Sequence, residues 1–147
     1  MMKTTCLVCL IVFSATTALA QASNSDRCEV ALAATNPKDN VMLGKFTTII
    51  GEEELTRKAF RLPGTRLFIV ASVFYTDESM ASEKGSDSVM LELALSTGQK
   101  RDVLHSLSWA EAEMQLHDFE VGRVEMLIKS GGSPRLVVME CRKDVRH

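Results

Sequence analysis

The sequence is poor in aromatic residues and in the motifs that carry catalysis. It contains one Trp and one Tyr among 147 residues, which is little material for a sugar-stacking cleft. It also lacks a Gly-x-Ser-x-Gly elbow and a Gly-x-x-x-x-Gly-Lys phosphate loop, and after residue 20 it has no Cys-x-x-Cys pair. The acids at 52–54 could form a carboxylate pair, but three adjacent acids after Gly51 are more typical of a solvated turn. We therefore expect a protein that is not an enzyme and that needs no cofactor.

Histidine is equally scarce, and its spacing gives little support for a metal site. The three histidines are His105, His117 and His147. Glu113 and His117 stand four residues apart, so they would share one face of a helix and could hold a metal ion. A solvated pair at this spacing is commoner, and no third ligand is suitably placed. We expect no metal.

The charges are mixed and form no long block of one sign. The chain has 17 Lys and Arg against 19 Asp and Glu, without the clustered basic surface of a nucleic-acid-binding protein. After residue 20 no apolar run is long enough to cross a bilayer. The sequence therefore predicts neither a nucleic-acid partner nor a stable membrane anchor.

The first twenty residues have the pattern of an export signal. A short positive start at 1–3 precedes an apolar run at 6–13, and the small residues Ala18 and Ala20 then occupy the −3 and −1 positions of a peptidase site. A second possible cut follows Ala22. An N-terminal anchor would need about 20 apolar residues, but the run breaks at Ser14. We expect export to the periplasm, with residues 1–20 removed.

Export removes two of the four cysteines and leaves Cys28 and Cys141. In an oxidising compartment such a pair is most simply a disulfide, and closing so long a loop would stabilise the fold by roughly 4 to 5 kcal/mol. Two free thiols would fit a reducing compartment instead. Half of a metal site is the other alternative, although no Cys-x-x-Cys or nearby histidine supports it.

Short apolar runs that alternate with turn signals predict one antiparallel β domain over 41–147. Residues 21–40 are a polar lead-in with a short strand around 28–32. The sequence Leu62-Pro63-Gly64-Thr65 predicts a type II turn between strands at 55–62 and 66–75. Both faces of the strand at 66–75 are apolar, which is typical of a central strand covered on both sides.

The later part of the domain contains three further strands and one expected helix. In the strand at 88–96 one face is apolar, and the other, with Glu92, is expected to be wetter. A final hairpin joins 123–129 to 135–142. Ser108 and Glu111 form a capping box, and helical spacing places Trp109 on a buried face. The expected fold is mainly β, a single antiparallel β-sandwich-like domain with one short helix near 108–117.

Two polar loops are suited to contact with a partner. The first, 79–88, offers hydroxyls and charge at Ser82, Glu83 and Ser86. The second runs from the end of one strand to the start of the next and comprises Lys129, Ser130, Gly131, Gly132, Ser133, Pro134 and Arg135. Its paired glycines allow close approach to the main chain, and its flanking cations complement acidic groups. A plain hairpin turn has the same composition, so that interpretation stays open.

Three short motifs follow one another along the chain: 60–63 (Phe-Arg-Leu-Pro), 85–89 (Gly-Ser-Asp-Ser-Val) and 126–133 (Met-Leu-Ile-Lys-Ser-Gly-Gly-Ser). Over about residues 60–141 this order resembles the periplasmic inhibitors of invertebrate-type lysozyme, which are small exported β-sandwich proteins. The resemblance implies that the loop at 130–133 would enter the active-site cleft of a lysozyme. Pro134 and Arg135 replace the Gly and Tyr of that family, and the insertion at 104–119 is foreign to it.

Taken together, the sequence predicts an exported protein that binds a muramidase or another peptidoglycan hydrolase and blocks it with surface loops. A related hypothesis is an immunity protein that protects its producer from a cell-wall-degrading toxin. The alternative is a non-enzymatic structural or assembly module of the envelope. The sequence does not indicate the oligomeric state.

Overall fold

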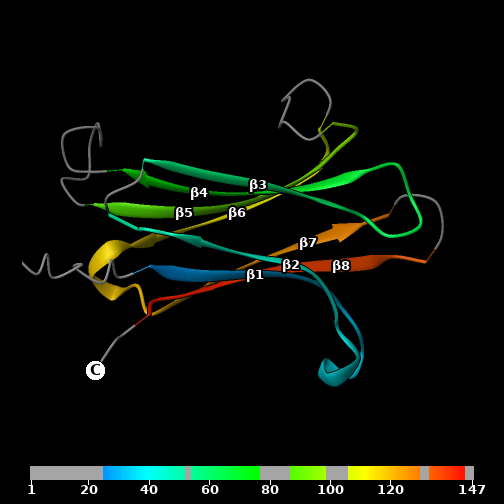
Figure 1. Cartoon of the computed structure of the whole chain (residues 1–147), viewed down its shortest axis with the longest axis horizontal. Helices are drawn as coiled ribbons and strands as arrows, with labels where there is room; N and C mark the ends of the chain where they lie inside the picture. Colours follow the sequence, from blue (N-terminus) through cyan, green and yellow to red (C-terminus); the bar gives the residue numbers. More distant parts are fainter. Residues whose placement is uncertain (1–24, 52–53, 77–86, 99–105, 130–132, 145–147) are drawn as a thin grey trace, which may run out of the picture.

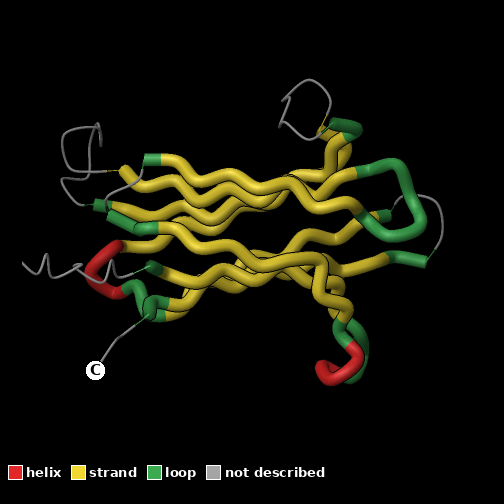
Figure 2. Tube along the Cα trace, in the orientation of Figure 1, coloured by secondary structure: helices red, strands yellow, loops and turns green. Residues whose placement is uncertain are grey.

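The computed structural model describes residues 25–51, 54–76, 87–98, 106–129 and 133–144. Within them, two antiparallel four-stranded sheets stack face to face (Figure 1, Figure 2). Sheet A has the order β2-β1-β8-β7, formed by Val41–Thr48, Asp26–Ala33, Arg135–Arg142 and Val121–Ile128. Sheet B has the order β3-β4-β5-β6, formed by Leu55–Arg61, Phe68–Thr76, Ser88–Ser96 and Ser106–Gln115. Two short 3-10 turns, η1 (Pro37–Asp39) and η3 (Leu116–Asp118), complete the described structure. The expected mainly-β sandwich is confirmed.

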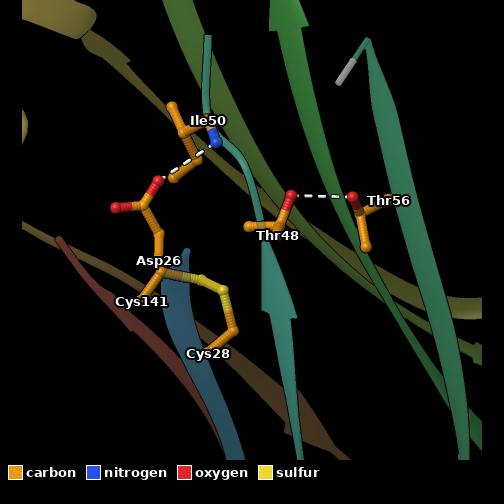
Figure 3. Close-up of a disulfide and its surroundings, with 6 residues drawn as sticks. All are labelled: Asp26, Cys28, Thr48, Ile50, Thr56 and Cys141. Atoms are coloured by element: carbon orange, nitrogen blue, oxygen red, sulfur yellow. Dashed lines mark hydrogen bonds between the residues drawn. A yellow bond between two sulfur atoms is a disulfide. The ribbon is translucent and has the colours of Figure 1, made fainter. Parts of the chain in front are cut away.

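The first and last strands of the fold lie side by side in the middle of sheet A. The lead-in contributes β1, which pairs with both β2 and β8, and this confirms the short strand expected around 28–32. Cys28 stands directly opposite Cys141 in the β1–β8 ladder. The two form the expected disulfide, with their Cα atoms 4.0 Å apart (Figure 3). The crosslink therefore joins neighbouring strands that are far apart in the chain.

The core lies between the two sheets and comes from alternate residues of each strand. In β5 the inward positions are filled by large apolar side chains with no exposed surface, such as Leu91 and Leu93. From sheet A, Val30, Met126 and Met139 pack against them. The period of two along each strand places these side chains on one face. The same period places Cys28 and Cys141 in this core.

Side-chain contacts join the two sheets along their lateral edges. On one side, the Thr48 and Thr56 hydroxyls are 2.7 Å apart and connect β2 to β3 (Figure 3). On the other side, the Ser108 hydroxyl donates to the Leu127 carbonyl at 3.3 Å and connects β6 to β7. These contacts hold the edge strands of one sheet against those of the other.

The prediction of a helix at 108–117 is wrong, because most of this segment belongs to the strand β6. It pairs antiparallel with β5, from Leu95 opposite Ser108 to Ser88 opposite Gln115. Ala110, Ala112 and Met114 pack against the core, whereas the alternate residues, Trp109 among them, face outward. Trp109 is 49% exposed, so its expected burial is also wrong. Pairing along the whole of β5 outweighs the local capping signal, and only the single turn η3 follows the strand.

The two ends of the sandwich carry different connections. We call the end that contains Ile128, paired with Arg135, the hairpin end. The opposite end, where Arg27 pairs with Arg142, is the terminal end, because the chain enters β1 and leaves β8 there. Figure 1 shows that the β3–β4 turn lies at the same end as the last residues of β7 and the first residues of β8. No described helix is long and apolar enough to cross a membrane.

Candidate functional site

The β3–β4 turn at the hairpin end is held by several hydrogen bonds. The Thr65 amide donates to the Leu62 carbonyl at 3.2 Å, and Gly64 has a φ of 75°, as the third residue of a type II turn requires. The Thr65 hydroxyl donates to the same carbonyl at 2.9 Å and accepts from the Leu67 amide at 3.0 Å. The predicted turn is confirmed, and its bonds make it a rigid projection.

Arg135 connects this turn to the β7–β8 hairpin. Its Nη1 donates to the Pro63 carbonyl at 3.4 Å, although the two residues are 72 positions apart in the chain. Lys129 and Ser133 are exposed on either side of the connection. The predicted contact residues Ser130, Gly131 and Gly132 lie outside the described residues. Two connections from different sheets therefore lie together at this end.

The charged residues of these two connections are all basic. Segments 59–71 and 127–137 contain no Asp or Glu. Their cations are Arg61, Arg66, Lys129 and Arg135. Nearby in the β1–β2 connection, Lys38 and Asp39 balance each other in charge. These two connections therefore present a cationic surface, which attracts carboxylates. The sequence identified Lys129 and Arg135, but only the topology brings Arg61 and Arg66 to them.

The second predicted contact loop belongs to the other end of the sandwich. Its anchoring residues Thr76 and Ser88 are paired at the far end of β4 from the β3–β4 turn, and their hydroxyls are 2.6 Å apart. Ser82, Glu83 and Ser86 themselves lie outside the described residues. A nine-residue strand separates the two ends, which is roughly 30 Å. One enzyme cleft would therefore contact only one of the two loops.

The terminal end contains a buried carboxylate beside the disulfide. Asp26 is 5% exposed, and its Oδ2 accepts a hydrogen bond from the Ile50 amide at 3.0 Å (Figure 3). Burial raises the pKa of Asp26, and the bond from Ile50 opposes that change. The carboxylate fixes the β2–β3 connection to the start of β1. We read it as a structural group.

The outer face of sheet A carries a shallow pocket of about 300 Å³ lined by Arg27, Glu29, Glu140 and Arg142. Ion pairs neutralise much of it. Glu29 contacts Lys45 at 2.7 Å, and Glu140 contacts Arg142 at 2.5 Å. A face covered by compensated charges remains well solvated, and the pocket offers no excess charge to a ligand. It is the weaker candidate site.

The outer face of sheet B differs from the sequence expectation. The face of β5 that was expected to be wetter is buried, with Glu92 3% and Ala94 0% exposed. Trp109 Nε1 donates to Glu92 Oε2 at 3.0 Å across the neighbouring strands. The alternation of apolar and acidic residues along 109–114 could have revealed a strand here. Nothing in the sequence pairs Trp109 with Glu92.

The described residues provide no cluster of three His, Cys, Asp or Glu side chains for a metal ion. The Glu113 and His117 pair has no shared helical face, because Glu113 is in β6 and His117 is in η3. His117 Nε2 instead lies 3.1 Å from Asp118 Oδ2, and both side chains are exposed. Comparisons with family models, with curated proteins and with solved structures found no match to this chain.

Proposed function

We propose that this protein is an exported inhibitor of a peptidoglycan-cleaving muramidase. The hairpin end would enter the active-site cleft of the enzyme. The observation that carries the proposal is the bond from Arg135 to the Pro63 carbonyl, which unites two connections into one cationic projection. The disulfide between Cys28 and Cys141 supports an oxidising compartment, and the signal-like residues 1–20 make the periplasm the proposed location.

The charge of the projection suits the chemistry of the target. Glycoside hydrolases of this kind use a pair of Asp or Glu side chains that flank the scissile bond. Lys129 is exposed at the tip of β7, and it is the residue that we place nearest those carboxylates. Arg135 has a different role, because its guanidinium holds the hairpin against the β3–β4 turn. Attraction between unlike charges speeds association and favours the acidic cleft over other surfaces.

Rigidity of the projection supports the same function. The bonds around Thr65 fix the β3–β4 turn before any partner binds. A preorganised loop loses less conformational entropy on binding, and this loss is a main cost of association. The glycines at 131 and 132 would let the enzyme approach the main chain closely. A lysozyme inhibitor and an immunity protein against a wall-degrading toxin would share this mode of action.

The test is a peptidoglycan lysis assay with several muramidases and the purified mature protein. We expect inhibition that weakens as salt is added, because salt screens the charge attraction. Lys129→Glu should reduce inhibition strongly, and the Ser130→Ala/Ser133→Ala double variant should reduce it less. Lys58→Glu is the matched control, since Lys58 is exposed in the middle of β3. Full lysis with every muramidase, or equal inhibition by Lys129→Glu, would contradict the proposal.

The second candidate function is a non-enzymatic assembly module of the envelope. The exposed Trp109 on the outer face of sheet B favours it, because Trp is enriched at the centres of protein interfaces. The same lysis assay separates the two candidates, since an assembly module would leave every muramidase active.

A further inference from the structure

The outer faces of the two sheets differ in how their charges are arranged. The outward residues of sheet A include five charged side chains joined in ion pairs: Glu29, Lys45, Arg123, Glu140 and Arg142. On sheet B the apolar outward residues are Leu55, Ala59, Phe68, Val70, Phe74, Met90, Ala94 and Trp109, and polar or charged residues occupy the other outward positions. Val70 and Ala94 are fully buried although neither belongs to the core between the sheets. Sheet A exposes Val121 and Leu127 beside its ion pairs, whereas the large apolar side chains that sheet B exposes are Leu55 and Trp109. The exposed charges of sheet B lie on its two edge strands.

One row of this face carries a charge at each lateral edge. This row contains one residue from each of the four strands, in register: Arg57, Ser72, Glu92 and Glu111. The inner members are buried and bonded: Arg57 Nε donates to Ser72 Oγ at 3.2 Å, and Glu92 accepts from Trp109. The outer members, Arg57 and Glu111, are exposed. The row therefore has a positive end on β3 and a negative end on β6.

The neighbouring outward positions have the same polarity. On β3, Arg61 is exposed opposite the outward Phe68. On β6, Glu113 is exposed opposite the outward Met90. The face thus carries cations along one lateral edge and carboxylates along the other, with apolar and buried polar side chains between them. Such a pattern can be complementary to itself.

We propose that this face packs against the same face of a second copy, with a twofold axis parallel to the strands. A half turn about that axis places β3 over β6 of the second copy at the same level along the strands. Arg57 then faces Glu111 of the second copy, and the contact occurs twice, as an isologous interface requires. A half turn about an axis across the strands would instead oppose Arg57 to Arg57. Only the first arrangement joins unlike charges.

The shapes along the face agree with this arrangement. Trp109 shares its row with Ala59, Val70 and Ala94, so a small residue on β3 lies at the level of each protruding indole. Its bond to Glu92 fixes the ring before association. Four strands about 4.8 Å apart and about 30 Å long present roughly 500 Å² per copy. Because central outward residues such as Val70 and Ser72 are already buried, two copies would bury at most about 1,000 Å², the lower limit of specific interfaces, which implies a reversible dimer.

The experiment is sedimentation velocity of the mature, oxidised chain over a wide range of concentration. We expect a monomer–dimer equilibrium. Arg57→Glu and Glu111→Arg should each raise the dimer dissociation constant by about tenfold or more, because each opposes like charges twice. A mixture of the two variants should recover the dimer, since every charge pair across that interface is again of unlike sign. The Arg57→Glu/Glu111→Arg double variant should recover it as well.

Arg27→Glu is the matched control, because Arg27 is exposed on β1 of sheet A, and it should leave the dissociation constant unchanged. Circular dichroism would verify that each variant is folded. A monomer at every concentration would overturn the proposal and leave the face to a different protein. So would a dimer that Arg57→Glu and Glu111→Arg do not weaken. None of these variants changes a residue of the hairpin end, so the result is independent of the inhibition assay.

Discussion

Removal of the disulfide should destabilise the protein by an amount that the loop length sets. Cys28 and Cys141 are 113 residues apart, and the chain-entropy model gives about 4.8 kcal/mol for a loop of this size. This is a large part of the stability of an ordinary domain. With an unfolding slope of about 2 kcal/mol per molar urea, the Cys28→Ala/Cys141→Ala variant should unfold at roughly 2.4 M less urea than the wild type.

The two single variants make the reasoning refutable. The crosslink is lost with the first cysteine, so Cys28→Ala and Cys141→Ala should each lose nearly the full amount, and the double variant little more. Equilibrium urea unfolding followed by circular dichroism measures all four free energies. Single losses of about half the total, which add up in the double variant, would mean that burial of the two side chains matters and the crosslink does not. The unfolding slope should also rise without the disulfide, because the unfolded chain expands.

Three further perturbations test the packing and the buried charge. Leu93→Ala should lower the free energy of unfolding by about 2 to 5 kcal/mol, because Leu93 has no exposed surface; urea unfolding measures this, and a loss below about 1 kcal/mol would contradict its central place. Gly44→Ala should cost about 1 to 3 kcal/mol, because an added Cβ would overlap the ring of Phe60; a neutral result would mean that the ring moves aside at no cost. Burial raises the pKa of Asp26 above 3.8, so the folded state favours its protonated form. The stability of the wild type relative to Asp26→Asn should therefore be greatest below pH 3.8 and fall as the pH rises through the raised pKa. Parallel pH profiles for the two proteins would refute that sign.

Most strands could be predicted because their signals are local. Turn residues at 62–65 separate two apolar runs, and the hydrogen bond from Thr65 to Leu62 confirms the type II turn. The burial of the strand at 68–76 on both faces followed from its two apolar faces. The disulfide was predicted from the two cysteines that would remain if residues 1–20 were removed, and the register of β1 and β8 confirms the pairing. Each of these predictions depended on a short stretch of sequence or on composition.

The error at 108–117 arose because two periodicities fit the same residues. Trp109, Ala112 and Leu116 match a helix, whereas Ala110, Ala112 and Met114 match the inward face of a strand. The choice between them depends on β5, whose whole length pairs with this segment, and single-segment reasoning cannot include that partner. The burial of Glu92 was missed for the same reason. Its bond comes from Trp109 on the next strand.

Only two of the four cations at the hairpin end could be predicted from the sequence. Lys129 and Arg135 flank a Gly-Ser stretch, and this local pattern was enough to predict them as contact residues. Arg61 and Arg66 surround what reads as an ordinary turn, and 72 residues separate Pro63 from Arg135. Their meeting depends on how sheet B is laid over sheet A. The stacking of one sheet on the other leaves no pattern in a short stretch of sequence.

The pairing of Arg27 with Arg142 has a practical consequence for handling the molecule. The backbone enters and departs on the side facing away from Lys129 and Arg135. A purification tag, a fluorophore or a bead coupled to either extremity would therefore leave the opposite pole pointing into solution. Surface immobilisation by the N-terminal or the C-terminal extremity should give the same measured affinity for any partner that binds at that pole.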